Sequence, residues 1–184
     1  MSAPFYYLIN SLIDIFTIGI LLNFLFRLLK VDYFNPLVKG IIKAVDFPSK
    51  ILRSFIKPIY SLDLSSFLIA LFVQAGAFYL YYLMQGTLDN MHLTILMWSF
   101  YSVILLILDM AWFIMLGGII LSWVARDNFH PAIILIRQMS DKFFKPFRTF
   151  LPPMGGLDFS PIFAFIVLTF FRDIFFNFAE ASGL

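Results

Sequence analysis

Four charged side chains lie inside long apolar stretches of the sequence and are the first candidates for chemistry: Asp14, Asp109, Arg172 and Asp173. A charge in the middle of a bilayer costs at least about 2.5–3.5 kcal/mol on insertion scales, so such residues normally face a bundle interior and find partners. One interpretation is that Arg172 pairs with one or two of the carboxylates and joins helices. Another is that the carboxylates form an ion or proton site. A third leaves Asp14 or Asp173 solvated near an interface.

A second group of candidates belongs to two basic segments between the apolar stretches. Each basic side chain near an anionic membrane surface contributes about 1 kcal/mol, and backbone N–H groups at the start of a helix can bind phosphate. These segments either anchor and orient the chain, or bind anionic lipid headgroups or another membrane protein. The residues for the second role are Lys50, Arg53, Lys145, Arg148, Gly155, Gly156, Asp158 and Ser160.

The composition excludes several other classes of function. Of 184 residues, 61% are apolar, 20% aromatic and 13% charged, whereas a soluble domain is about 45–50% apolar and about 25% charged. This excludes an ordinary soluble domain, a disordered chain and a nucleic-acid binder. The lack of cysteine removes disulfides, thiolate metal sites and thiol nucleophiles, and leaves the redox compartment undetermined. We expect His92 and His130 on opposite sides of a membrane, so they cannot form a metal pair, and the serines have no His–Asp partners on the same side. The sequence therefore predicts no metal site, cofactor or catalytic residue.

Four stretches are long enough to cross a bilayer, whose hydrocarbon core needs about 20 apolar residues in a helix. They cover residues 5–29, 64–84, 93–124 and 159–178. The first has no basic residue before it and no cleavage site of small residues, so we expect it to be retained rather than removed as a signal peptide. The sequence therefore predicts an all-α integral membrane protein with four transmembrane helices.

The basic residues predict the orientation of these helices. Of the 13 Lys and Arg residues, seven lie between Arg27 and Lys57 and five between Arg126 and Arg148. Lys and Arg near the ends of spans are retained on the cytoplasmic side. We therefore expect both long loops in the cytoplasm and both termini outside, in a multi-pass protein of the bacterial inner membrane.

The two halves of the chain repeat one design. With an offset of 95 residues, positions 32–65 match the second half at 12 of 34 places without a gap, and the same offset pairs Asp14 with Asp109. Each unit is a span, a loop and a span, so the two copies are expected to be parallel, related by an axis along the membrane normal. We place the units at residues 1–90 and 91–184. The charged pairs that match are Asp32/Asp127, Asp46/Asp141, Lys50/Lys145, Arg53/Arg148 and Asp63/Asp158.

The loops, residues 30–63 and 125–158, are expected to be more than linkers. In the first, apolar residues recur at helical spacing with basic residues on the opposite face, a pattern typical of an amphipathic helix in the membrane interface. Pro48 is expected to break it into two short helices. Pro36 and Pro131 suit the first turn of such a helix, and Asp158 or Ser160 can cap the fourth span.

Three segments resemble the twice-repeated motif of the YggT family of small bacterial and plastid membrane proteins. They are Asn35-Pro36, Lys145-Pro146-Phe147-Arg148 and the run from Pro152 to Pro161; the second copy has His130-Pro131 where the family usually has Asn-Pro. The resemblance covers nearly the whole chain. It implies a membrane location and a non-enzymatic role, in a family linked to osmotic tolerance, to organelle or cell division and to maturation of membrane-bound cytochromes.

These observations together predict a non-enzymatic inner-membrane scaffold or accessory subunit that takes part in the assembly of membrane proteins. It would bind membrane-protein partners and anionic lipid through its basic interfacial helices. The alternative is an ion-conducting or ion-homeostasis protein active in osmotic stress, self-associated into an oligomer and using Asp14 and Asp109. The two predictions differ in the complex that mild detergent would extract: a stoichiometric partner, or a closed homo-oligomer.

Overall fold

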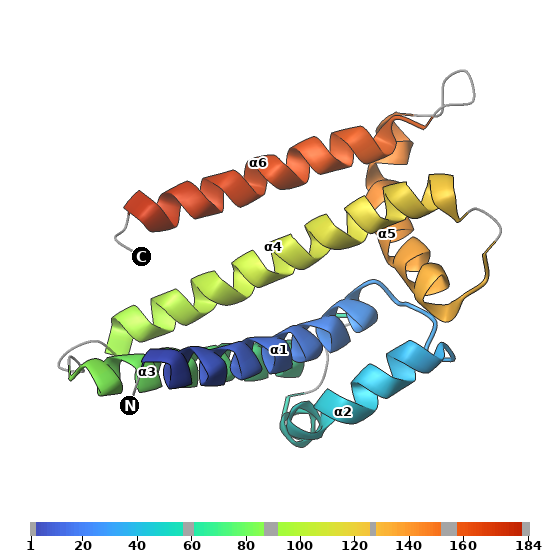
Figure 1. The fold of residues 1–184 in the computed structure, drawn as a ribbon. Coiled ribbons are helices and arrows are strands. Elements are labelled where there is room, and N and C mark those ends of the chain that lie inside the picture. The colour runs from blue at the N-terminus through green and yellow to red at the C-terminus, as the bar shows by residue number, and fades with distance from the viewer. Residues whose placement is uncertain (1–2, 57–60, 87–91, 126–127, 152–157, 182–184) are drawn as a thin grey trace. The chain divides into compact units, whose positions relative to one another are not determined.

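The computed structural model describes residues 3–56, 61–86, 92–125, 128–151 and 158–181. Within these ranges the chain forms six α-helices and no strand, in the order shown in Figure 1. Four of the helices are long and apolar enough to cross a membrane. They are α1 (Ala3–Leu28), α3 (Leu64–Gln85), α4 (His92–Val124) and α6 (Ser160–Ala181). The prediction of an all-helical chain with four apolar spans is therefore confirmed.

The other two helices lie in the loops that join the spans: α2 (Pro36–Arg53) and α5 (Pro131–Phe150). Each begins at a proline, whose fixed φ and missing N–H suit the first turn of a helix. The residue before each proline caps the helix. Asn35 Oδ1 accepts a hydrogen bond from the Leu37 N–H at 2.9 Å, and His130 Nδ1 accepts one from the Ala132 N–H at 3.3 Å. Histidine thus serves here as an acceptor in the same position as asparagine.

The expectation that Pro48 divides the first loop helix was wrong, because α2 continues through it to Arg53. A proline removes one main-chain hydrogen bond and strains the preceding turn. An ion pair between Asp46 and Arg53, seven residues apart, spans the proline and joins the turns on either side of it. In α5, the Arg148–Asp141 ion pair spans Pro146 in the same way at 3.1 Å.

The chain divides into two compact units, of which unit 1 comprises residues 1–28 and 40–104. In unit 1, α1 packs along α3, and Phe67 of α3 contacts Phe24 of α1 with a centroid separation of 6.0 Å. Helix α2 lies close to α1, since a Cβ added at Gly19 would come within 2.8 Å of the Val45 side chain. A small residue at position 19 therefore sets the approach of the loop helix to the span.

Unit 2 comprises residues 29–39 and 105–184. Its core joins α4, α5 and α6 through Met115, Phe144 and Ala164, all of them buried. Helix α4 approaches α5 even more closely than α1 approaches α2, because a Cβ added at Gly118 would overlap the side chain of Ser140. Glycine is thus required at this crossing.

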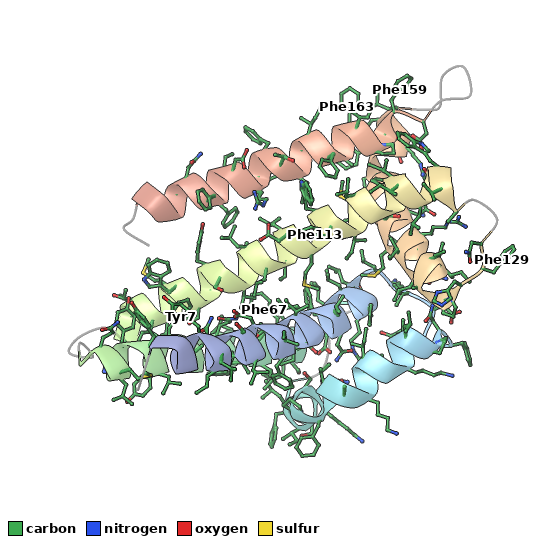
Figure 2. All side chains as sticks on the ribbon, in the orientation of Figure 1. Tyr7, Phe67, Phe113, Phe129, Phe159 and Phe163 are labelled. Atoms are coloured by element: carbon green, nitrogen blue, oxygen red, sulfur yellow. The ribbon has the colours of Figure 1, made fainter. Side chains whose placement is uncertain are left out.

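The spans expose many large apolar side chains. On α4, Phe113 is 66% exposed. Phe159 and Phe163, at the start of α6, are also exposed in part (Figure 2). Soluble monomers rarely expose apolar surface on this scale. Such a surface suits contact with lipid or with another apolar surface, as a multi-pass membrane protein requires.

Candidate functional site

Unit 1 contains a cluster of two arginines and two aspartates, contributed by three elements. Arg27 comes from the end of α1, Asp46 and Arg53 from α2, and Asp63 from the residue before α3. Arg27 Nε lies 3.0 Å from Asp63 Oδ2, and Arg53 Nε lies 3.4 Å from the same oxygen. Both arginines also approach Asp46 Oδ1. Each guanidinium therefore bridges both carboxylates and ties the loop helix to the ends of two spans.

Asp63 is the most enclosed member of this cluster, with a side chain that is 0% exposed. Its carboxylate also caps α3, accepting hydrogen bonds from the Ser66 main-chain N–H at 3.4 Å and the Ser66 Oγ at 2.9 Å. Asn23 of α1 donates to Asp46 Oδ1 at 2.8 Å. A buried carboxylate is tolerated only when charged and polar partners replace water, and these contacts supply them.

Unit 2 contains an equivalent cluster built on a single arginine. Arg148 lies 3.1 Å from Asp141 through Nη1 and 2.8 Å from Asp158 through Nε. Ser160 donates its N–H to Asp158 Oδ1 at 2.9 Å. Burial acts to raise the pKa of Asp158, but the hydrogen bonds from Arg148 and Ser160 outweigh it and lower that pKa overall. Burial likewise acts to lower the pKa of Arg148, and its two carboxylate partners reverse the effect.

Both clusters are followed by a serine at the start of the next span, and this serine makes the same hydrogen bond in each unit. Ser65 Oγ donates to the Ile56 carbonyl at 3.1 Å, and Ser160 Oγ donates to the Leu151 carbonyl at 3.2 Å. Each bond spans nine residues, and both serines are buried. This bond closes the connection between loop helix and span, so Ser160 has a clear structural role.

The carboxylates inside the spans have different partners in the two units. In unit 1, Asp14 accepts hydrogen bonds from Gln74 at 3.2 Å and from Asn10 at 3.0 Å. In unit 2, Asp109 accepts one from Arg172 Nε at 2.6 Å. The structure therefore pairs Arg172 with Asp109, and gives Asp14 neutral partners. Asp173, next to Arg172, is exposed.

The residues predicted from the basic loops separate into three groups. Arg53, Arg148 and Asp158 lie within the ion-pair clusters. Lys50 and Lys145 are exposed. Gly155 and Gly156 lie outside the described residues.

Sequence reasoning did not nominate Arg27, Asp46, Asp63 or Asp141 as site residues, although all four contribute to the clusters. A signal for three of them was present. The aspartates at 46 and 63 recur as Asp141 and Asp158, on either side of an arginine that also recurs. Arg27 has no such signal, because its equivalent is Ser122.

Four apolar helices, with one ion-pair cluster built twice, define a helical membrane protein with a duplicated motif. The chain matches the family model described as CCB3/YggT over residues 2–84 and again over residues 97–179. The chain belongs to the CCB3/YggT family.

Individual relatives agree with this assignment. PA0392, an uncharacterized protein of Pseudomonas aeruginosa, is 32% identical over 163 residues, which cover 88% of this chain and 83% of that protein. The uncharacterized protein YggT of Escherichia coli K12 is 26% identical over 162 residues, 88% of this chain and 84% of that one. YlmG homolog protein 2, a chloroplastic protein of Arabidopsis thaliana, is 41% identical over 61 residues, 33% of this chain and 24% of that protein. No solved structure matches the chain.

Proposed function

We propose that the protein is a non-enzymatic scaffold or accessory subunit of the inner membrane, which binds anionic lipid and membrane-protein partners through α2 and α5. The observation that carries the proposal is that the arginines and the lysines of this chain have different environments. Every arginine in the described ranges contacts a carboxylate or a main-chain carbonyl. Every lysine in those ranges is exposed. Four of these five arginines hold the loop helices in place, whereas Arg172 joins α6 to α4. The lysine ammonium groups are accessible to a partner.

The side chains of α2 support a position in the membrane interface. One face of the helix is buried through Val38, Val45 and Ser49. The exposed remainder carries lysines beside large apolar side chains: Lys39, Lys43, Lys50, Phe47 and Ile51. In an interfacial helix, apolar side chains enter the acyl boundary while ammonium groups meet the headgroups. On α5, Lys142 and Lys145 are the corresponding exposed charges.

The excess of basic residues in both loops favours the cytoplasmic leaflet, with the termini outside. Lysine suits this role because its ammonium is a compact, strongly hydrated point charge that interacts without fixed geometry. Anionic lipid would be held by several such charges at about 1 kcal/mol each. A membrane-protein partner with an acidic cytoplasmic face would be recognised by the same lysines.

The test neutralises the lysines of α2 without changing its apolar residues. Purified protein carrying Lys39→Gln, Lys43→Gln and Lys50→Gln is compared with the triple Lys→Arg variant, which keeps the charge. Native mass spectrometry in micelles containing phosphatidylglycerol should show several-fold fewer bound lipids for the Gln variant and little change for the Arg variant. Mild-detergent extraction should recover a stoichiometric membrane-protein partner with the Arg variant only. Equal lipid and partner binding by both variants would refute the proposal.

A second candidate, a role in ion flux, is favoured by one observation on Asp14. This carboxylate lies in the middle of α1, and its hydrogen-bond partners Asn10 and Gln74 are both neutral. Intramembrane carboxylates often mark ion and proton pathways, and Asp14 has no cationic partner among its hydrogen bonds. Asp14→Asn should then change ion flux in liposomes and growth under salt stress, and Asp173→Asn should not. If Asp14→Asn and Asp109→Asn both leave flux and growth unchanged, the ion role is abandoned.

A further inference from the structure

Unit 2 has a cavity of about 710 Å³ beside its ion-pair cluster. The walls are the last turns of α4, the middle of α5 and the first turn of α6. This volume lies within the range of about 300–1,000 Å³ that is usual for sites that bind small molecules. Asp141, Arg148 and Asp158 line it, together with Ser122 and Arg137.

The internal repeat allows the cavity to be compared with the equivalent place in unit 1, which side chains fill. In unit 1, Arg27 supplies a second guanidinium to the two carboxylates, and Asn23 lies one turn earlier on the same helix. With the offset of 95 residues, their equivalents in unit 2 are Ser122 and Gly118. Both are short, and both line the cavity. The cavity therefore coincides with a missing cationic side chain, while the carboxylates that would bind it are retained.

The remaining arginine does not use all the acceptors of these carboxylates. Arg148 bonds only Oδ1 of Asp141, whose side chain is 59% exposed. Each carboxylate has about four lone-pair sites, so the pair can accept further N–H donors. In unit 1 the second donor is Arg27. In unit 2 that place is open to solvent, and a ligand with N–H donors can fill it.

A second guanidinium also lines the cavity, that of Arg137, one turn before Asp141 on α5. Arg137 donates through Nη2 to the main-chain carbonyls of Ala125 and Leu121, which fixes its guanidinium at the C-terminal end of α4. A guanidinium has five N–H donors, so Arg137 has donors beyond those on Nη2. The cavity thus carries two carboxylates and two guanidiniums. Its charge suits a zwitterion better than a simple anion.

The position along the spans indicates where such a ligand would come from. Gly118 lies six residues before the end of α4, which is roughly 9 Å at 1.5 Å per residue. If α4 crosses the bilayer, a cavity this close to its end lies where the span leaves the hydrocarbon core for the headgroups. Trp123 and Ile162 at its edge are 82% and 55% exposed and offer an apolar surface for acyl chains.

We propose that this cavity binds the headgroup of a zwitterionic phospholipid with a primary ammonium group. The ammonium takes the place of the Arg27 guanidinium and donates to Asp141 and Asp158, and the phosphate lies on the side of Arg137. The site does not depend on the proposed function, because the exposed lysines of α2 do not line it.

The first experiment needs only the wild-type chain. The delipidated protein is offered equal amounts of phosphatidylethanolamine, phosphatidylcholine and phosphatidylglycerol with identical acyl chains, and bound lipid is counted by native mass spectrometry. A primary ammonium has three N–H donors, whereas the trimethylated group of phosphatidylcholine has none. Phosphatidylethanolamine should bind at least about tenfold more tightly than phosphatidylcholine, a difference of about 1.4 kcal/mol. Equal binding of these two lipids would overturn the proposal.

The second experiment fills the cavity with a side chain of the protein itself. Ser122→Arg restores the residue that unit 1 has, so it should abolish the preference for phosphatidylethanolamine and leave the binding of phosphatidylglycerol to the exposed lysines unchanged. Thr149→Arg, which adds the same charge to α5 at an exposed position that does not line the cavity, is the matched control. A preference that survives Ser122→Arg overturns the proposal.

Two further measurements separate lipid binding from misfolding and from the binding of a basic peptide. Size-exclusion chromatography and thermal unfolding verify that Ser122→Arg folds, and Asp141→Asn, which removes an exposed acceptor, tests the same site independently. Asp141→Asn should also reduce the preference for phosphatidylethanolamine. If the cavity instead binds a lysine or arginine of a partner protein, added basic peptide will bind wild type and not Ser122→Arg, with no headgroup preference. That result would overturn the assignment to lipid.

Discussion

Asp63 and Asp158 occupy equivalent positions in the repeat but experience different environments. The Asp63 side chain is 0% exposed and contacts two arginines, whereas the Asp158 side chain is 30% exposed and contacts one. A buried charge that loses its partner destabilises a protein far more than an exposed one does. The difference arises from Arg27, which contacts Asp63 in the first cluster. The second cluster has Ser122 at the equivalent position.

This difference predicts unequal effects of removing the two carboxylates. Asp63→Asn leaves Arg27 and Arg53 with Asp46 as their shared carboxylate, and should cost about 3 kcal/mol or more. Asp158→Asn should cost about 1 kcal/mol or less. Thermal and denaturant unfolding in mild detergent would measure both. A larger effect at position 158 would contradict the assignment of Asp63 to the enclosed cluster.

The lowered pKa of Asp158 predicts a dependence of stability on pH. A carboxylate whose pKa is depressed in the folded protein contributes stability in full above its unfolded-state pKa, and loses it as pH falls through the folded value. The unfolded value is about 3.8. The stability difference between wild type and Asp158→Asn should therefore be constant above pH of about 5 and shrink below about 3.8. Unfolding curves of the two proteins, measured from above pH of about 5 to below about 3.8, provide the test, and a difference that grows on acidification would have the wrong sign.

Gly118 provides a test of the close packing between α4 and α5. A Cβ at this position would overlap the side chain of Ser140, whereas a Cβ at Gly76 would meet nothing within 4 Å. Gly118→Ala should lower stability by about 1–3 kcal/mol through overpacking. Gly76→Ala should be neutral or slightly stabilising, because alanine favours a helix. Equal melting temperatures for the two variants would show that α4 and α5 are further apart than described.

At the scale of helices, each loop helix contains a proline that is spanned by an ion pair. Asp46 and Arg53 flank Pro48, and Asp141 and Arg148 flank Pro146. The two prolines are not at equivalent places in the repeat, but both lie between the paired residues. The ion pair is therefore the shared feature, and it allows the proline to vary in position without ending the helix.

The ion pair predicts how α2 responds to the loss of Arg53. Arg53→Gln removes the connection across Pro48, so the main-chain amides after the proline should exchange hydrogen about tenfold faster, which corresponds to about 1.4 kcal/mol of local stability. Lys50→Gln, which removes an exposed charge on the same turns, should leave exchange unchanged. Hydrogen–deuterium exchange read by mass spectrometry distinguishes the two. Faster exchange in both variants would contradict this prediction, because it would show that any loss of positive charge destabilises the end of α2.

The helices differ in how far the sequence alone could predict them. The four spans were predicted closely, because a long run of apolar residues in a helix leaves little freedom for its ends; α3 was expected over 64–84 and is Leu64–Gln85. The continuity of α2 was not predicted, because the effect of Pro48 depends on whether Asp46 and Arg53 meet. The pairing of Arg27 with Asp63 also depends on contacts between residues far apart in the chain. Residue types were visible in the sequence, and their partners were not.

At the scale of the whole molecule, the two compact units do not coincide with the simple halves of the chain. Unit 2 includes residues 29–39 as well as residues 105–184. Asn35, before α2, donates through Nδ2 to the Pro131 carbonyl at 2.8 Å, and the Asp32 N–H donates to Gln138 Oε1 at 3.2 Å. The start of the first loop therefore packs on the first turns of the second loop helix.

The proposed topology can be tested directly because the chain has no cysteine. We expect cysteines introduced at the exposed positions Ser54 and Thr149 to react with an impermeant maleimide only from the cytoplasmic side. His92→Cys, at the exposed start of α4, should react from the outside. Inside-out and right-side-out vesicles provide the two measurements. Labelling of Ser54→Cys and Thr149→Cys from opposite sides would contradict a parallel arrangement of the repeats.

The hydrogen bond between Asn35 and Pro131 has a consequence for synthesis of the chain. The two residues are 96 positions apart, so at about 5–20 residues per second Pro131 is made roughly 5–20 s after Asn35. During that interval the amide of Asn35 has no carbonyl to bind, even after the first pair of spans has been made. The start of the first loop therefore acquires this contact only after the second loop helix has begun to be made.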